Sequence, residues 1–153
     1  MFGTLRLMPR PHLVSIGYEG RDVQSLVEEL ATNGVSVLVD VRLNPISRKP
    51  GLSKTKLAEA LAARGIRYVH HRELGNPKEN RDGFRQGSPA SLNRFERILQ
   101  GESAGAALHH VSELLDGEVV ALLCFERDHS QCHRRLVADA LRESTPAVDV
   151  TML

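Results

Sequence analysis

Short apolar runs alternate with amphipathic helical patterns along the chain. Among the apolar runs, VSVLVDVR at 35–42 is rich in β-branched residues and is apolar on both faces, which is typical of a strand buried inside a parallel sheet. Four further runs have a similar character. The predicted strands are residues 13–18, 35–42, 66–71, 118–125 and 148–153.

Helical patterns fill the intervals between these runs. Asp22 is a suitable N-cap for the first helix, and Asn33-Gly34 is a stop signal for it. Residues 72–88 are instead polar and rich in Gly, Asn, Arg and Lys, so we predict a long loop there, of the kind that is usually functional or mobile. The predicted helices are residues 22–32, a helix capped by Ser53 that ends near Arg64, and residues 89–100, 104–116 and 131–143.

This alternation of strands and helices predicts an α/β fold. We expect a mostly parallel five-stranded sheet flanked by helices in a Rossmann-like three-layer architecture, with right-handed crossovers. A chain of 153 residues has the size of one domain, so residues 1–153 are predicted to form a single domain.

Composition and charge narrow the class of protein. No apolar run approaches the roughly 18 residues of a membrane span, and the N-terminal MFGTLRLMPRPH lacks the apolar segment of a signal peptide. Two cysteines are too few for a disulfide scaffold, so we expect a cytoplasmic protein without a membrane partner. Residues 42–97 hold 13 basic and 5 acidic residues, and this local excess indicates an anionic partner.

Polar side chains follow four of the predicted strands. In an open parallel sheet, ligands bind beyond the carboxyl ends of the strands, so these side chains are predicted to converge on one site. Arginine forks and a helix N-terminus near Lys54 suit a phosphate or carboxylate. The residues concerned are Tyr18, Glu19, Asp40, Arg42, Ser47, Arg48, Lys54, His70, His71, Cys124, Glu126, Cys132, His133 and Arg134.

Some of these residues have a structural interpretation as well. Asp40 and Arg42 are two positions apart on a strand and therefore favour an ion pair on one face. Tyr18 suits a core position with its hydroxyl at the rim. Glu126 shares the side of the strand on which Cys124 lies and is expected to point into the cleft beside Arg134, where a carboxyl suits general acid–base chemistry.

The cysteines allow three interpretations. Cys124, His129, Cys132 and His133 have the atoms of a zinc site, but the C-x7-C-H spacing lacks short ligand pairs, and neighbouring Cys132 and His133 are expected to diverge on a helix. Cys124 also occupies the strand-end position of the nucleophile in rhodanese-like sulfurtransferases, although the loop FERDHSQ contains no glycine to cradle an anion. We favour a packing role for both cysteines, with no metal, cofactor or disulfide.

The segments IGYEGRD, VDVRLNPISRKPGLSK, IRYVHHRELGNP and LLCFERDHSQCHR resemble, in this order, the family called domain of unknown function 488. The resemblance spans the whole chain, with LGNP where other members more often have a double glycine and Leu52 where phenylalanine is common. It implies an α/β fold but no activity. The site residues that it implies are Tyr18, Asp40, Arg42, Ser47, Arg48, Glu126, Cys132, His133 and Arg134.

Our leading hypothesis is an enzyme that acts on an anionic, phosphate-bearing small molecule, nucleotide or nucleic-acid component. Glu126 is the expected catalytic acid or base, assisted by His133 or Asp40. One alternative is a non-catalytic nucleic-acid or nucleotide-binding module, against which an aromatic content of 4% argues. The other is a thiol sulfurtransferase that uses Cys124. The residues expected to bind the substrate are Tyr18, Glu19, Arg42, Ser47, Arg48, Lys54, Cys132 and Arg134.

Overall fold

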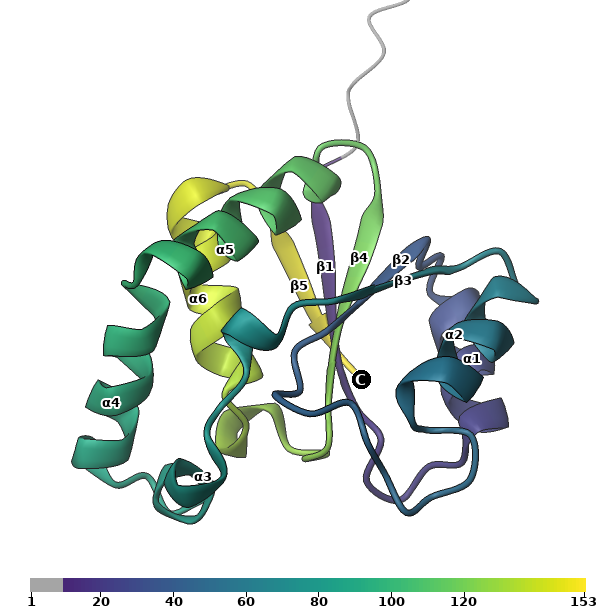
Figure 1. Ribbon diagram of the computed structural model, residues 1–153. Coiled ribbons are helices and arrows are strands. Elements are labelled where there is room, and N and C mark those ends of the chain that lie inside the picture. Colours follow the sequence, from purple (N-terminus) through teal and green to yellow (C-terminus); the bar gives the residue numbers. More distant parts are fainter. Residues whose placement is uncertain (1–9) are drawn as a thin grey trace, which may run out of the picture.

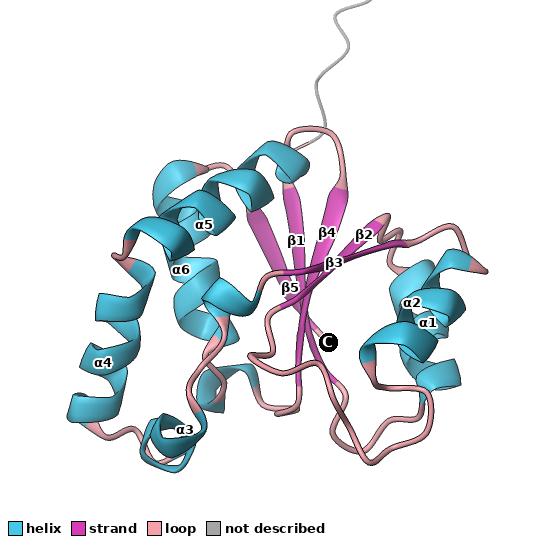
Figure 2. Cartoon of the chain, in the orientation of Figure 1, coloured by secondary structure: helices cyan, strands magenta, loops and turns pink. Residues whose placement is uncertain are grey.

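The computed structural model describes residues 10–153, so the first nine residues of the predicted domain lie outside the described part. Five strands form one sheet in the order β3-β2-β4-β1-β5, and every pairing is parallel (Figure 2). The predicted α/β class and the five predicted strands are therefore confirmed. The strands are β1 (His12–Gly17), β2 (Val37–Asp40), β3 (Arg67–His70), β4 (Val119–Cys124) and β5 (Asp149–Met152).

Helices cover both faces of the sheet and complete three layers, with α1 and α2 on one face and α3 to α6 on the other (Figure 1). The chain itself explains this division. Its first two connections move toward the β3 edge and its last two toward the β5 edge, and right-handed crossovers in opposite directions place their helices on opposite faces. The helices are α1 (Val23–Thr32), α2 (Lys54–Ala62), α3 (Lys78–Arg85), α4 (Pro89–Leu99), α5 (Glu102–Leu115) and α6 (Arg134–Ser144).

Each face of the sheet has its own apolar core. Leu38 of β2 packs with Leu26 of α1 and Leu57 of α2, whereas Val39 packs on the other side with Phe95 of α4 and Val137 of α6. All four β2 residues are buried, because side chains that alternate between faces enter one core or the other. Burial on both faces of the sheet explains why β2 lies in a continuous apolar run of the sequence.

The segment 72–88, predicted as a loop, is mostly helical. It begins with the short 3-10 helix η1 (Arg72–Leu74) and continues as α3, whose Phe84 packs edge-to-face against Phe95 at 6.1 Å. The prediction was wrong because Leu74 and Phe84 are the only large apolar anchors in an otherwise polar segment. Tertiary packing, rather than a local apolar stripe, stabilises this helix.

The start of α1 agrees with the prediction, whereas the start of α6 differs from it. Asp22 caps α1 as expected, in a capping box with Ser25. The last helix begins at Arg134, later than predicted, because the preceding residues form a 3-10 helix, η2 (His129–Gln131), which the Asp128 carboxylate caps. Within residues 10–153, no helix is long and apolar enough to cross a membrane.

Candidate functional site

A small pocket lies at the carboxyl edge of the sheet, beyond the ends of β1, β2 and β4, and has a volume of about 170 Å³. The helices after β1 and β2 cover one face of the sheet and the helix after β4 covers the other, so the chain opens a crevice between these strand ends. We call it the strand-end pocket. Its lining residues are Tyr18, Arg42, Leu43, Asn44, Ile46, Asn76, Arg81, Arg85, Cys124, Phe125, Glu126 and His133.

Gly17 brings two of these strand ends together. A Cβ at this position would lie 1.8 Å from the backbone oxygen of Glu126, so only glycine permits the close approach of the two chains. The parallel pairing continues past the strands, where the Tyr18 amide donates to the Cys124 carbonyl at 3.1 Å. As a result, the Tyr18 ring stands edge-on to Phe125 at 5.3 Å, and Glu126 lies beside both.

Asp40, Arg42 and Tyr68 form a saturated group of buried polar side chains, which we call the Asp40 network. The Asp40 carboxylate is completely buried and accepts hydrogen bonds from the Arg42 guanidinium at 2.7 and 2.9 Å and from the Tyr68 hydroxyl at 2.5 Å. Arg42 also donates to the Leu52 carbonyl at 2.7 Å. The expected ion pair is present.

The same contacts perturb the titration of the network. Burial alone would lower the pKa of Arg42, but the hydrogen bond and charge of Asp40 raise it above its ordinary value. Burial and Asp40 both raise the pKa of the Tyr68 hydroxyl. Arg42 therefore lines the pocket as a fixed cation whose charge is already matched.

Glu126 places its carboxyl group in the pocket, on the side that the sequence predicted. Its carboxylate partner is Arg85 of α3, with Nε 3.3 Å from Oε1, and not the expected Arg134. Arg134 reaches the backbone oxygen of Glu126 instead, because it lies behind the strand end at the start of α6. Burial and the neighbouring Cys132 raise the pKa of Glu126.

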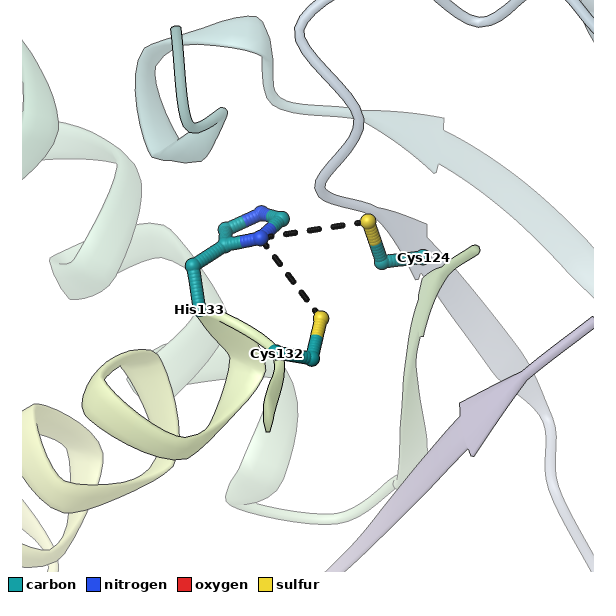
Figure 3. Close-up of side chains that lie close together, drawn as sticks. All are labelled: Cys124, Cys132 and His133. Atoms are coloured by element: carbon teal, nitrogen blue, oxygen red, sulfur yellow. Dashed lines mark hydrogen bonds between the residues drawn. The ribbon is translucent and has the colours of Figure 1, made fainter. Parts of the chain in front are cut away.

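Cys124, Cys132 and His133 form a second buried group, the Cys–His cluster (Figure 3). His133 Nδ1 lies 3.8 Å from the Cys124 sulfur and 3.6 Å from the Cys132 sulfur, while its Nε2 donates to the Val41 carbonyl at 2.8 Å. The expected divergence of Cys132 and His133 was wrong. Cys132 follows η2 in an extended conformation, and His133 already has helical backbone angles as the N-cap of α6, so their side chains converge.

The cluster distributes its charge unequally. Burial raises the pKa of Cys132. The hydrogen bond from Cys124 and the charge of His133 have the opposite and larger effect, so this pKa lies well below its usual range. The hydrogen bond with Cys132 and burial raise the pKa of Cys124. Burial opposes the charged form of His133, but nearby Cys132 raises the pKa of that ring overall. The Cys132 sulfur is therefore the preferred site of negative charge.

Several predicted site residues lie elsewhere. Arg48 and Lys54 are exposed outside the pocket, and the Ser47 hydroxyl accepts from the Lys49 amide. Ser47 and Ser53 bond to each other, and the Lys49 ammonium donates to two carbonyls near β1. The part of the loop from Ser47 to Lys54 therefore lies outside the pocket lining, whereas Asn44 and Ile46 belong to it. The remaining residues outside the lining are Glu19, which accepts from the Arg127 amide, His70, which bonds the Arg42 carbonyl, His71, which bonds His110, His129, which bonds Ser15, and the buried Asp40, Cys132 and Arg134.

The sequence interpretation missed the α3 side of the pocket. Asn76, Arg81 and Arg85 line it, and Gly75 admits this segment because a Cβ there would lie 2.5 Å from the Leu43 Cα. The available signal was the pair of arginines four residues apart, which share one face of a helix. That signal is meaningful only once residues 78–85 are known to be helical.

The profile of the family described as "Domain of unknown function DUF488" matches residues 22–141. The chain belongs to this family. The DUF488 match includes β2, β4 and α3 with their pocket residues, and it confirms the resemblance found in the sequence. No curated protein and no solved structure matches the chain.

Proposed function

We propose that the protein is an enzyme that performs acid–base chemistry on a small phosphate-bearing molecule, such as a nucleotide or a nucleic-acid component. The observation that carries this proposal is the lining of the strand-end pocket, where Arg81 and Arg85 line the same pocket as Glu126, and Arg85 contacts its carboxyl group. Guanidinium groups bind phosphate through paired, charge-assisted hydrogen bonds.

The balance of charge supports an anionic ligand. Asp40 already matches the charge of Arg42. Arg85 is shared between Glu126 and Asp82, whereas no carboxylate of the described residues lies within salt-bridge distance of Arg81. Arg81 Nε donates to the Asn76 carbonyl, which orients the guanidinium without neutralising it. A bound phosphate would supply the missing negative charge.

The size of the pocket limits what enters it. Its volume of about 170 Å³ lies below the roughly 300–1,000 Å³ of pockets that enclose drug-sized ligands. A phosphate group with a few adjoining atoms fits such a space, so the rest of a nucleotide would extend into solvent. Glu126 is assigned as the general acid or base because its carboxyl lines the same pocket, and the pocket-lining His133 is the assisting group.

Phosphate binding tests the proposal. Titration calorimetry with inorganic phosphate should show saturable binding to the wild-type protein. The affinity should fall about 10- to 100-fold in Arg81→Gln and in Arg85→Gln, as expected for a lost charge-assisted hydrogen bond. Arg97→Gln is the matched control, since Arg97 is exposed on α4 outside the pocket and undergoes the same charge change. Equal weakening in all three variants would contradict a phosphate site in the pocket.

Turnover distinguishes an enzyme from a binding module. Candidate phosphate-bearing small molecules should be incubated with the wild-type protein and with Glu126→Gln, and the products identified by mass spectrometry. We expect turnover that Glu126→Gln abolishes while phosphate binding persists. If no substrate is converted and affinity for oligonucleotides falls steeply with salt, the nucleic-acid-binding alternative is favoured instead.

A further inference from the structure

Three side chains that are suited to binding a metal converge at the base of the strand-end pocket. Cys124 comes from the end of β4, and Cys132 and His133 precede the first residue of α6. Their ligand atoms all lie within 4.8 Å of one another, and both sulfurs contact the same ring nitrogen of His133 (Figure 3). Cys124 and His133 also line the pocket, so the cluster adjoins the proposed substrate site.

The two nitrogen–sulfur distances in the cluster are close to those of a tetrahedral zinc site. Zinc binds thiolate sulfur at about 2.3 Å and imidazole nitrogen at about 2.0–2.1 Å. With tetrahedral angles, these bond lengths place a nitrogen and a sulfur ligand about 3.5 Å apart. The two nitrogen–sulfur distances in the cluster are 3.6 and 3.8 Å. Binding of zinc would therefore require only small movements.

The orientation of His133 gives a second argument. A carbonyl can only accept a hydrogen bond, so the 2.8 Å contact with Val41 requires the proton on Nε2. In the neutral ring, Nδ1 then presents its lone pair to the sulfurs. Both sulfurs lie within reach of this one nitrogen, at 3.8 and 3.6 Å. A ring nitrogen held by a backbone carbonyl is also the usual arrangement of a metal-binding histidine.

We propose that Cys124, Cys132 and His133 bind one zinc ion, with its fourth coordination position directed toward the strand-end pocket. The cluster contains three ligand atoms among residues 10–153, and three protein ligands with one open position are typical of catalytic zinc sites. A bound zinc ion would polarise a phosphate oxygen or a water molecule at the base of the pocket. Soft thiolate ligands favour zinc over magnesium or calcium.

Arg134 fits this assignment. It is completely buried, and its Nε and Nη1 find no hydrogen-bond partner within the described part of the chain. A buried guanidinium next to the cluster offsets negative charge that two thiolates would bring. The expectation that the cysteines carry no metal depended partly on the divergence of Cys132 from His133, which the structure contradicts. The test of the zinc site is independent of the proposed function, because zinc binding is measured without a substrate.

Metal analysis provides the first test. The full chain, with any affinity tag removed, should retain about one zinc per molecule after dialysis, as measured by plasma mass spectrometry. Metal-free protein titrated with Co²⁺ should develop sulfur-to-cobalt charge-transfer absorption that saturates at one equivalent and disappears on addition of zinc. Absence of stoichiometric metal binding, or a cobalt spectrum without the sulfur band, overturns the proposal.

Variants locate the ion. Cys124→Ser and Cys132→Ser should each lower zinc affinity by more than about 100-fold, since the loss of an outer partner alone lowers it by about 10- to 100-fold. His109→Gln removes an exposed histidine of α5 and should leave the affinity unchanged. Should the cysteine variants fail to fold, zinc must instead slow the alkylation of both cysteines in the wild-type protein. Undiminished binding in the folded variants, or alkylation at the same rate with and without zinc, overturns the proposal.

Failure of this proposal and failure of the proposed function are distinguishable. Phosphate titration of the metal-free protein reports on Arg81 and Arg85, whereas the cobalt spectrum reports on the sulfurs.

Discussion

Two buried polar groups lie at the ends of neighbouring strands, and they differ in how completely they are satisfied. In the Asp40 network after β2, the carboxylate has several donors, and the arginine reaches both that carboxylate and a backbone carbonyl. In the Cys–His cluster after β4, two sulfurs face one ring nitrogen, and the adjacent Arg134 has two nitrogens without partners among residues 10–153.

This difference separates architecture from function. A fully satisfied buried network fixes one conformation and has no remaining capacity for a ligand. A partly satisfied group at the base of a pocket retains that capacity, because a ligand can complete its bonding. By this criterion the Asp40 network positions Arg42, whereas the pocket-facing residues after β4 are the candidates for chemistry.

The largest effect is expected when the satisfied network loses its charge. Asp40→Asn preserves the volume of the side chain but leaves the Arg42 guanidinium buried without a counter-ion, so unfolding free energy should fall by about 3–5 kcal/mol. Urea denaturation measures this. Asp139→Asn is the control, since it breaks an exposed pair with Arg142 and should change stability by no more than about 0.5 kcal/mol. A similar small effect at Asp40 would refute its architectural role.

The next effect concerns the backbone contact that joins the strand ends. Gly17→Ala forces a methyl group onto the Glu126 carbonyl, so the two strand ends must separate. We expect the free energy of unfolding to fall by about 3 kcal/mol, which is the upper end of the usual cost of overpacking. Gly105→Ala is the control because nothing lies within 4 Å of its Cβ position in α5. Alanine there should raise stability by about 0.5–1 kcal/mol. Stabilisation by both substitutions in urea denaturation would contradict the close approach at Gly17.

Glu126→Gln should have little effect on stability even though it abolishes the proposed turnover. Its contact with Arg85 is a single bond of 3.3 Å to a half-exposed arginine, and such pairs contribute about 0–1 kcal/mol. Thermal unfolding of Glu126→Gln beside Asp40→Asn therefore tests the comparison directly. If Glu126→Gln destabilises the protein as much as Asp40→Asn does, Glu126 belongs to the architecture.

The sheet could be predicted from the sequence because each buried parallel strand can be recognised from its own residues. Each strand appears as an apolar run, and the residue that follows it must lie at the carboxyl edge. This reasoning correctly placed Tyr18, Arg42, Cys124, Glu126 and His133 at one pocket. The family resemblance is confirmed by the DUF488 match, but the family supplies no activity.

The remaining features of the site depend on tertiary contacts, which cannot be recognised from a short stretch of sequence. Arg81 and Arg85 reach the pocket because Phe84 anchors α3 against Phe95, a contact between separate helices. Arg48 and Lys54 were predicted at the pocket, but the Lys49 ammonium binds carbonyls near β1, and residues 47–54 lie outside the lining. Prediction of the convergence of Cys132 and His133 required knowledge that the backbone changes from extended at Cys132 to helical at His133, just before α6.

The smallest expected effect comes from a third polar group, at the end of β3, which is only partly buried. His71 Nε2 lies 2.8 Å from His110 Nδ1, and Glu73 lies 3.5 Å from its other nitrogen. Burial, followed by repulsion from His110, lowers the pKa of His71, despite the opposing effect of Glu73. The unfolded chain therefore binds a proton at a higher pH than the folded protein does. Stability is fully present above the unfolded pKa of about 6.5 and declines as the pH falls through the lower folded value.

His71→Gln should accordingly make stability less dependent on pH between about 7.5 and 5, by less than about 1 kcal/mol because solvent screens part of the ring. Urea denaturation at several pH values measures the change. Some dependence must remain, since burial also lowers the pKa of His129. A steeper decline in His71→Gln than in the wild type would show that the charged ring is favoured in the folded state. In that case the β3 group would be satisfied through Glu73, and its contrast with the Cys–His cluster would sharpen.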